Sequence, residues 1–124
     1  MNAAAIKDVL AELRSATGPN YALEQKIAAA MEWTRFRSNW PPRVMTSVDD
    51  ALLLVPDDWF WRVGKTSLFQ AWAWVSKHHP DHCDPGRNEF GYKRENYEPS
   101  CTAAMALSVA ALEARLAIVE KRDR

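Results

Sequence analysis

The side chains best suited to chemistry gather in a short polar stretch in the second half of the chain. Imidazole and thiol groups, the ligand types that zinc prefers, occupy four of six consecutive positions. These are His78, His79, His82 and Cys83. Pro80 interrupts the run, and its spacing matches no recognised pairing of metal ligands. The spacing therefore favours an exposed polar loop with no metal and no cofactor, and zinc or nickel bound at these four residues is the alternative.

A second stretch, GKTS at residues 64–67, is similar to the end of a phosphate-binding loop. The full motif needs a glycine five positions before Gly64, where this chain has Trp59, and it leads into a helix. Here a strand is expected to follow. We therefore predict that residues 64–67 form a tight turn between two strands.

Two pairs of adjacent carboxylates could in principle supply a general acid and a general base. Asp49 and Asp50 fall where a helix should begin, and Asp57 and Asp58 fall where a turn should lead into a strand. Acidic residues are common at both places for structural reasons. No catalytic residue is assigned, and we predict that the protein is not an enzyme.

The most promising binding segment is the irregular stretch 33–46, which contains arginines and aromatic residues without an intervening acid. Arginine pairs with phosphates, and aromatic rings stack on bases. The candidate residues are Trp33, Arg35, Phe36, Arg37, Trp40 and Arg43. The alternative is that the rings pack under the loop and the arginines are solvated.

Composition narrows the choice of partner. The chain has 124 residues, which fits one domain spanning 1–124. Lys plus Arg number 16 and Asp plus Glu number 16, so the net charge is zero. A general basic field for nucleic acid is therefore missing, and self-association is easier than usual. Neither a membrane-spanning apolar run nor a signal peptide is visible, so we expect no membrane contact. The two cysteines lack a CxxC spacing, which together with the missing signal peptide leads us to expect a cytoplasmic protein.

Hydrophobic periodicity predicts four helices and about three strands. The helices are expected at 3–15, from Asn20 to about 32, from Ser47 to Pro56, and from 100 or 102 to about 120. The strands are expected at 59–63, 68–75 and, at an edge, about 90–94. Large apolar groups alternate onto both faces of the first two strands, so we expect cover on both sides. The predicted fold is α+β, an antiparallel sheet of about three strands sandwiched by four α-helices.

Three stretches together resemble the phage ABA sandwich domain family of small phage and prophage proteins. They are TSVDDALLLVPDDW at 46–59, CTAAMALSVAALEARL at 101–116 and LRSATGPNYALEQKIAAAMEW at 13–33. The chain departs from the family pattern at Asp58, where glycine is common, and at Ala103, where proline is common. The resemblance implies helices on both sides of a sheet and a location in the bacterial host cell. It supplies no catalytic residues.

These observations lead to one functional expectation and one alternative. We expect a non-enzymatic phage or prophage accessory protein that acts through protein–protein contact, with another protein or with a second copy of itself as a homodimer. The alternative is a nucleic-acid-binding module that uses the loop 33–46. The zero net charge disfavours this alternative.

Overall fold

The computed structural model of the chain describes residues 2–33, 40–67, 70–77, 89–95 and 102–122. For residues 65–67, 70, 89–95 and 122 it describes the backbone alone. The elements are α1 (Ala3–Ser15), α2 (Tyr21–Ala30), α3 (Val48–Ala51), the 3₁₀ turn η1 (Leu52–Leu54), β1 (Phe60–Ser67), β2 (Gln70–Ser76), β3 (Glu89–Glu95) and α4 (Ala103–Arg122).

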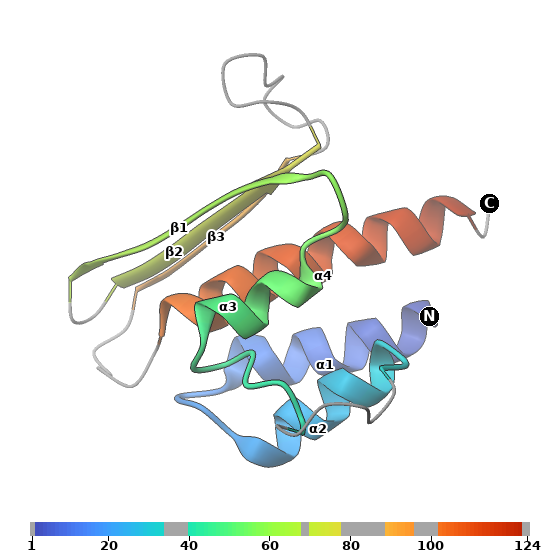
Figure 1. The fold of residues 1–124 in the computed structure, drawn as a ribbon, viewed down its shortest axis with the longest axis horizontal. Helices are drawn as coiled ribbons and strands as arrows, with labels where there is room; N and C mark the ends of the chain where they lie inside the picture. The colour runs from blue at the N-terminus through green and yellow to red at the C-terminus, as the bar shows by residue number, and fades with distance from the viewer. Residues whose placement is uncertain (1, 34–39, 68–69, 78–88, 96–101, 123–124) are drawn as a thin grey trace.

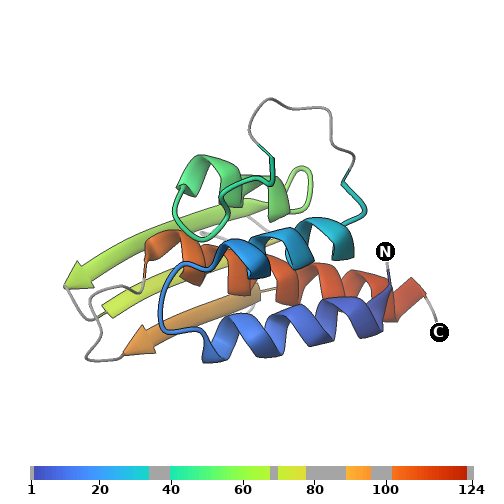
Figure 2. The same cartoon turned by 90° about the horizontal axis from the view of Figure 1, so that it is seen from below.

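The described elements stack in layers, with α4 in the middle (Figure 1). The strands pair antiparallel in the order β1-β2-β3, and α4 packs against them. On its other side α4 contacts α1, and α2 packs on α1. Figure 2 shows the same order from below, with α1 and α2 nearest the viewer. The α+β class with an antiparallel sheet is therefore confirmed.

The expectation of helices on both sides of the sheet is wrong for the described part of the chain. All its helices lie on one side of the sheet (Figure 1). The reason lies in β2, where Ala71, Ala73 and Val75 face α4 and are almost completely buried. Their small size lets the helix approach closely. The large residues of the same strand, Trp72 and Trp74, point to the other face and remain partly exposed.

The two N-terminal helices form where the sequence predicts them, because local signals define their ends. Asn2 accepts a hydrogen bond from the backbone N–H of Ala4 (2.8 Å), and Asn20 accepts one from that of Leu23 (3.1 Å). Each bond satisfies a backbone donor that the helix itself cannot pair. The apolar stripe of α1 is buried as expected: Ile6, Val9, Leu10 and Leu13.

Helix α4 is buried on more than one side because it lies between the sheet and α1. Its alanines at 104, 106, 110, 111 and 114 are each at most 1% exposed. Small side chains allow neighbouring elements to approach the helix backbone on both sides. Thr102 caps the helix by accepting a hydrogen bond from the N–H of Met105 (3.0 Å).

The predicted turn at 64–67 is wrong, because these residues continue β1. The connection to β2 falls at 68–69, outside the described residues. Gly64 is needed for another reason. A Cβ added there would lie 2.6 Å from Cζ2 of Trp72, so the absence of a side chain makes room for the indole ring across the strand pair. Gly64 therefore permits the close approach of the Trp72 ring and does not form a turn.

The third helix is shorter than predicted. It ends at Ala51, continues as the 3₁₀ turn η1, and stops before Pro56. The hydroxyl of Ser47 caps it by accepting from the N–H of Asp50 (3.2 Å), as expected. The Asp50 carboxylate does not return a bond to Ser47 as in a capping box, because it accepts from the backbone N–H of Arg43 (2.7 Å).

Candidate functional site

The basic-aromatic segment is described only in part. Arg35, Phe36 and Arg37 lie outside the described residues, and so does any contact they make. Trp33 is half-buried and packs against the core, and Trp40 is also half-buried. For Trp33, the structure therefore agrees with the interpretation that the rings pack under the loop.

Arg43 is tied to the fold by an ion pair with a buried carboxylate. Its guanidinium Nη1 donates to Oε1 of Glu24 (3.1 Å), whose side chain is only 2% exposed. The other oxygen, Oε2, accepts from the buried backbone N–H of Met45 (3.2 Å). The guanidinium also lies 4.8 Å from the ring centroid of Tyr21. Part of the charge that the nucleic-acid alternative assigns to phosphate contact therefore stabilises the connection between α2 and α3.

The chain following Arg43 is held by two hydroxyl groups from α4. Ser108, fully buried, donates to the carbonyl of Val44 (2.7 Å). Thr102 donates to the carbonyl of Met45 (2.5 Å). These bonds satisfy carbonyls that would otherwise be buried without a partner. Nucleic-acid binding by residues 33–46 stays a prediction, and within the described part of the segment Val44 and Met45 belong to the buried core.

A similar structural role accounts for Arg115 in α4. Its guanidinium donates to the carbonyls of Leu53 (3.3 Å), Leu54 (2.5 Å) and Val55 (3.3 Å) at the end of η1. Burial lowers the pKa of Arg115 from its usual value, and the Asp57 carboxylate opposes this by raising it. The guanidinium thus satisfies backbone carbonyls as a helix cap would, and links the α3–η1 segment to α4.

The other predicted chemical sites give no reactive arrangement that can be described. His78, His79, His82 and Cys83 lie outside the described residues, and the described part contains no group of three or more metal-ligating side chains. Residues 64–67 lie in a strand and are not followed by a helix, so they do not form a phosphate-binding loop.

A shallow groove lies between α1 and α2. Half of its lining residues are alanines, and the charged Asp8, Glu12 and Lys26 also line it. An exposed ion pair between Lys26 and Glu12 spans the two helices (2.8 Å). These side chains offer little beyond contact surface.

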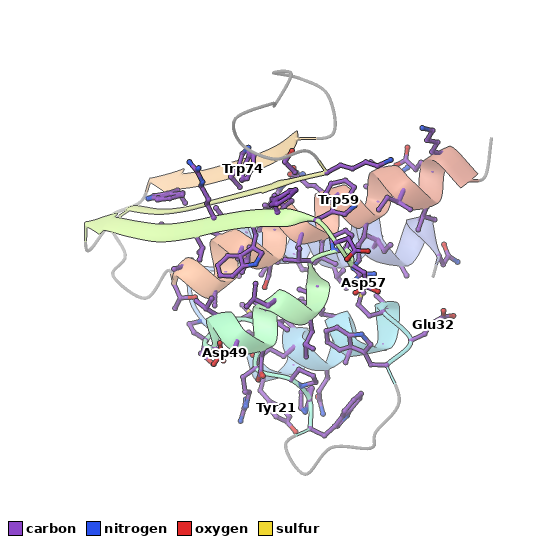
Figure 3. All side chains as sticks on the ribbon, turned by 45° about the horizontal axis from the view of Figure 1, so that its top comes forward. Tyr21, Glu32, Asp49, Asp57, Trp59 and Trp74 are labelled. Atoms are coloured by element: carbon purple, nitrogen blue, oxygen red, sulfur yellow. The ribbon has the colours of Figure 1, made fainter. Side chains whose placement is uncertain are left out.

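The surface that sequence reasoning missed is the side of the sheet opposite α4, here called the outer face. Strand register assigns to it, among the residues whose side chains are described, Phe60, Arg62, Gly64, Trp72, Trp74 and the buried Ser76. Arg62 lies over the Trp74 ring, with its guanidinium carbon 5.8 Å from the ring centroid. Figure 3 shows Trp74 on the side of the sheet away from α4, whereas Tyr21 lies at the opposite side of the molecule.

The arrangement of the outer face follows a regular cross-strand pattern. Trp72 pairs with Gly64 on β1 and with Lys93 on β3, and Trp74 pairs with Arg62 and Gly91. Each tryptophan therefore has one glycine and one basic residue as neighbours. The glycine at 64 lets the Trp72 ring lie against the neighbouring strand.

The sequence of β2 itself distinguishes the outer face from the face that packs against α4. In QAWAWV, at residues 70–75, alanine alternates with tryptophan. Alanine marks the face on which a helix packs closely, and tryptophan marks the face that no helix needs to approach. Both sets of residues are apolar, and the size of the side chain is the property that distinguishes the two faces.

Comparisons with known proteins give no relative from which a role could be transferred: no family model, curated protein or solved structure matched the chain. Within the described residues, no helix is both long and apolar enough to span a bilayer. The function must therefore be argued from the surface itself.

Proposed function

We propose that this protein is a non-enzymatic accessory module of phage or prophage type that binds a partner protein through its outer face. The observation that carries the proposal is the group of aromatic rings with an arginine on a sheet face that the described helices leave uncovered. Tryptophan, tyrosine and arginine dominate the residues that contribute most to protein–protein affinity. An open sheet face presents them on a rigid support.

The buried polar side chains support the same interpretation. Glu24, Ser108 and Arg115 each bind backbone atoms of the segments 43–45 or 53–55. Their hydrogen-bonding capacity is used to hold the fold. The outer face, in contrast, carries aromatic rings, whose removal from water by a partner is favourable.

Position-specific photo-crosslinking in bacteria tests the proposal. A benzophenone amino acid at position 60, on the outer face, is compared with one at position 21, on α2. Phe60 is 41% exposed and Tyr21 is 47% exposed, so the two positions are matched for accessibility. From position 60 we expect a crosslink to a protein other than a second copy of this chain, identified by its mass, and from position 21 we expect none.

A second variant identifies the residues responsible. Adding Trp74→Ser to the position-60 protein should abolish the crosslink, since losing a central tryptophan costs about 2 kcal/mol or more, roughly a 30-fold loss of affinity. Far-ultraviolet circular dichroism controls for folding. Equal crosslinking from positions 21 and 60, or a crosslink unaffected by Trp74→Ser in a folded protein, would rule out the outer face as the contact surface.

A further inference from the structure

The edge of the sheet formed by β1 carries an unusual concentration of exposed aromatic surface. Among the described residues, the large hydrophobic side chains that are exposed are Tyr21, Phe60 and Trp61. Phe60 and Trp61 are consecutive in β1, so they point to opposite faces of the same edge. Trp61 pairs with the buried Val75 and lies on the face toward α4, yet it is 44% exposed. Its position at the edge explains this exposure.

The two edges of the sheet differ in how far their sequences discourage pairing. β3 has four charged residues in seven, the pattern by which natural edge strands avoid association. β1 has two charged residues in eight, Arg62 and Lys65, and contains no proline. β1 is at the end of the strand order, so no described strand pairs with its outer edge. Pairing with another strand is therefore much less hindered at β1 than at β3.

We propose that two copies of this chain pair antiparallel along β1 about a two-fold axis near Trp61, which joins their sheets into one. An axis perpendicular to the sheet keeps the helices of both copies on the same side. With Trp61 on the axis, the two Trp61 rings meet each other, and Phe60 faces Arg62 of the second copy. This register also keeps the two Arg62 guanidinium groups from lying directly opposite each other, which would be unfavourable.

The dimer also changes the size of the outer face. Three strands about 4.8 Å apart and seven residues long at about 3.3 Å per residue cover a projected area of roughly 330 Å². A stable protein interface takes about 800 Å² of accessible surface from each partner. Joining two sheets doubles the projected area to roughly 660 Å², which brings the outer face close to that size.

The contact itself is small, so the dimer should be weak and concentration-dependent. It consists of one pair of short strand segments with aromatic contacts on both faces. Interfaces of this size belong to the weak, transient class. The zero net charge of the chain means that long-range repulsion does not oppose the association.

Sedimentation velocity and light scattering from about 5 to 500 µM test this inference on the protein alone, independently of any other partner. We expect the mass to rise from that of the monomer, 14.1 kDa, toward twice that value. Trp61→Ser should keep the protein monomeric, and Tyr21→Ser, a change at an equally exposed aromatic residue, should leave the dimer unchanged. A monomer at all concentrations, assembly beyond two copies, or an undiminished dimer in Trp61→Ser would overturn the inference.

Hydrogen exchange gives a readout that needs no variant. Backbone N–H groups on the outer edge of β1 should exchange several-fold more slowly at high protein concentration than at low, while exchange in α2 stays the same. Concentration-independent exchange along β1, under conditions where the mass shows a dimer, would place the interface elsewhere and refute pairing through β1.

Discussion

Replacing Glu24 with alanine should destabilise the protein far more than replacing Glu12, although both carboxylates form ion pairs. Glu24 is 2% exposed and accepts from the buried N–H of Met45 as well as from Arg43. Glu12 pairs with Lys26 in water, with side chains that are 45% and 59% exposed. Comparing the stabilities of the two alanine variants therefore separates the effect of an ion pair from the effect of satisfying a buried backbone donor.

The expected magnitude follows from the groups that Glu24→Ala removes. Leaving the Met45 N–H buried and unpaired costs about 1–3 kcal/mol. Losing the one buried methylene group, Cγ, costs about 0.8 kcal/mol, and the cavity left by the carboxylate adds to this cost. Relief of the desolvated carboxylate offsets part of this sum, so we expect a net loss of about 2–4 kcal/mol. Glu12→Ala should cost about 0–1 kcal/mol, as is usual for an exposed pair.

Urea unfolding followed by tryptophan fluorescence measures both changes. At about 2.1 cal/mol/K per residue, 124 residues give an unfolding entropy near 0.26 kcal/mol/K. A loss of 2–4 kcal/mol then corresponds to a decrease in Tm of roughly 8–15 °C. Glu24→Gln keeps the side-chain volume and one acceptor, and should fall between the two alanine variants. If Glu24→Ala lay within 1 kcal/mol of Glu12→Ala, Glu24 would not anchor the loop as described.

Substitutions at three further positions test individual features by the same urea assay. Asp58 has φ 66°, so Asp58→Gly should raise the free energy of unfolding by about 0.5 kcal/mol and Asp58→Ala should lower it; a loss with glycine would contradict the strain argument. Ser108→Ala leaves the carbonyl of Val44 without its donor and should cost about 1–3 kcal/mol, whereas a neutral result would mean that the carbonyl finds another partner. Gly64→Ala puts a methyl group against Trp72 and should cost about 1–3 kcal/mol with a shift in tryptophan emission; an unchanged spectrum would show that the ring does not lie there.

Elements defined by neighbouring residues could be predicted from the sequence. The caps at Asn20 and Ser47 join groups three residues apart, and both form as expected. The stop at Pro56 and the apolar stripe of α1 are equally local.

Features that depend on distant residues were missed or misinterpreted. Gly64 was assigned to a turn because the Trp72 ring that needs its space belongs to another strand. For Arg43 the sequence offered a ligand or solvent as the partner, because the buried carboxylate of Glu24 is nineteen positions away in the sequence. In both cases the residue type was informative, but its partner could be identified only once the chain was folded.

The central place of α4 has a consequence for how the chain must be made. This helix contacts α1, α3, η1 and all three strands, yet it is the last described element in the sequence. When the ribosome has synthesised everything up to residue 102, the inner face of the sheet and the apolar stripe of α1 still lack the surface that buries them. Stable folding of these elements must therefore wait until α4 has been synthesised, and the preceding segments are exposed to proteases and to one another until then. A premature stop codon anywhere before α4 should leave no stable fragment, however much of the chain it preserves.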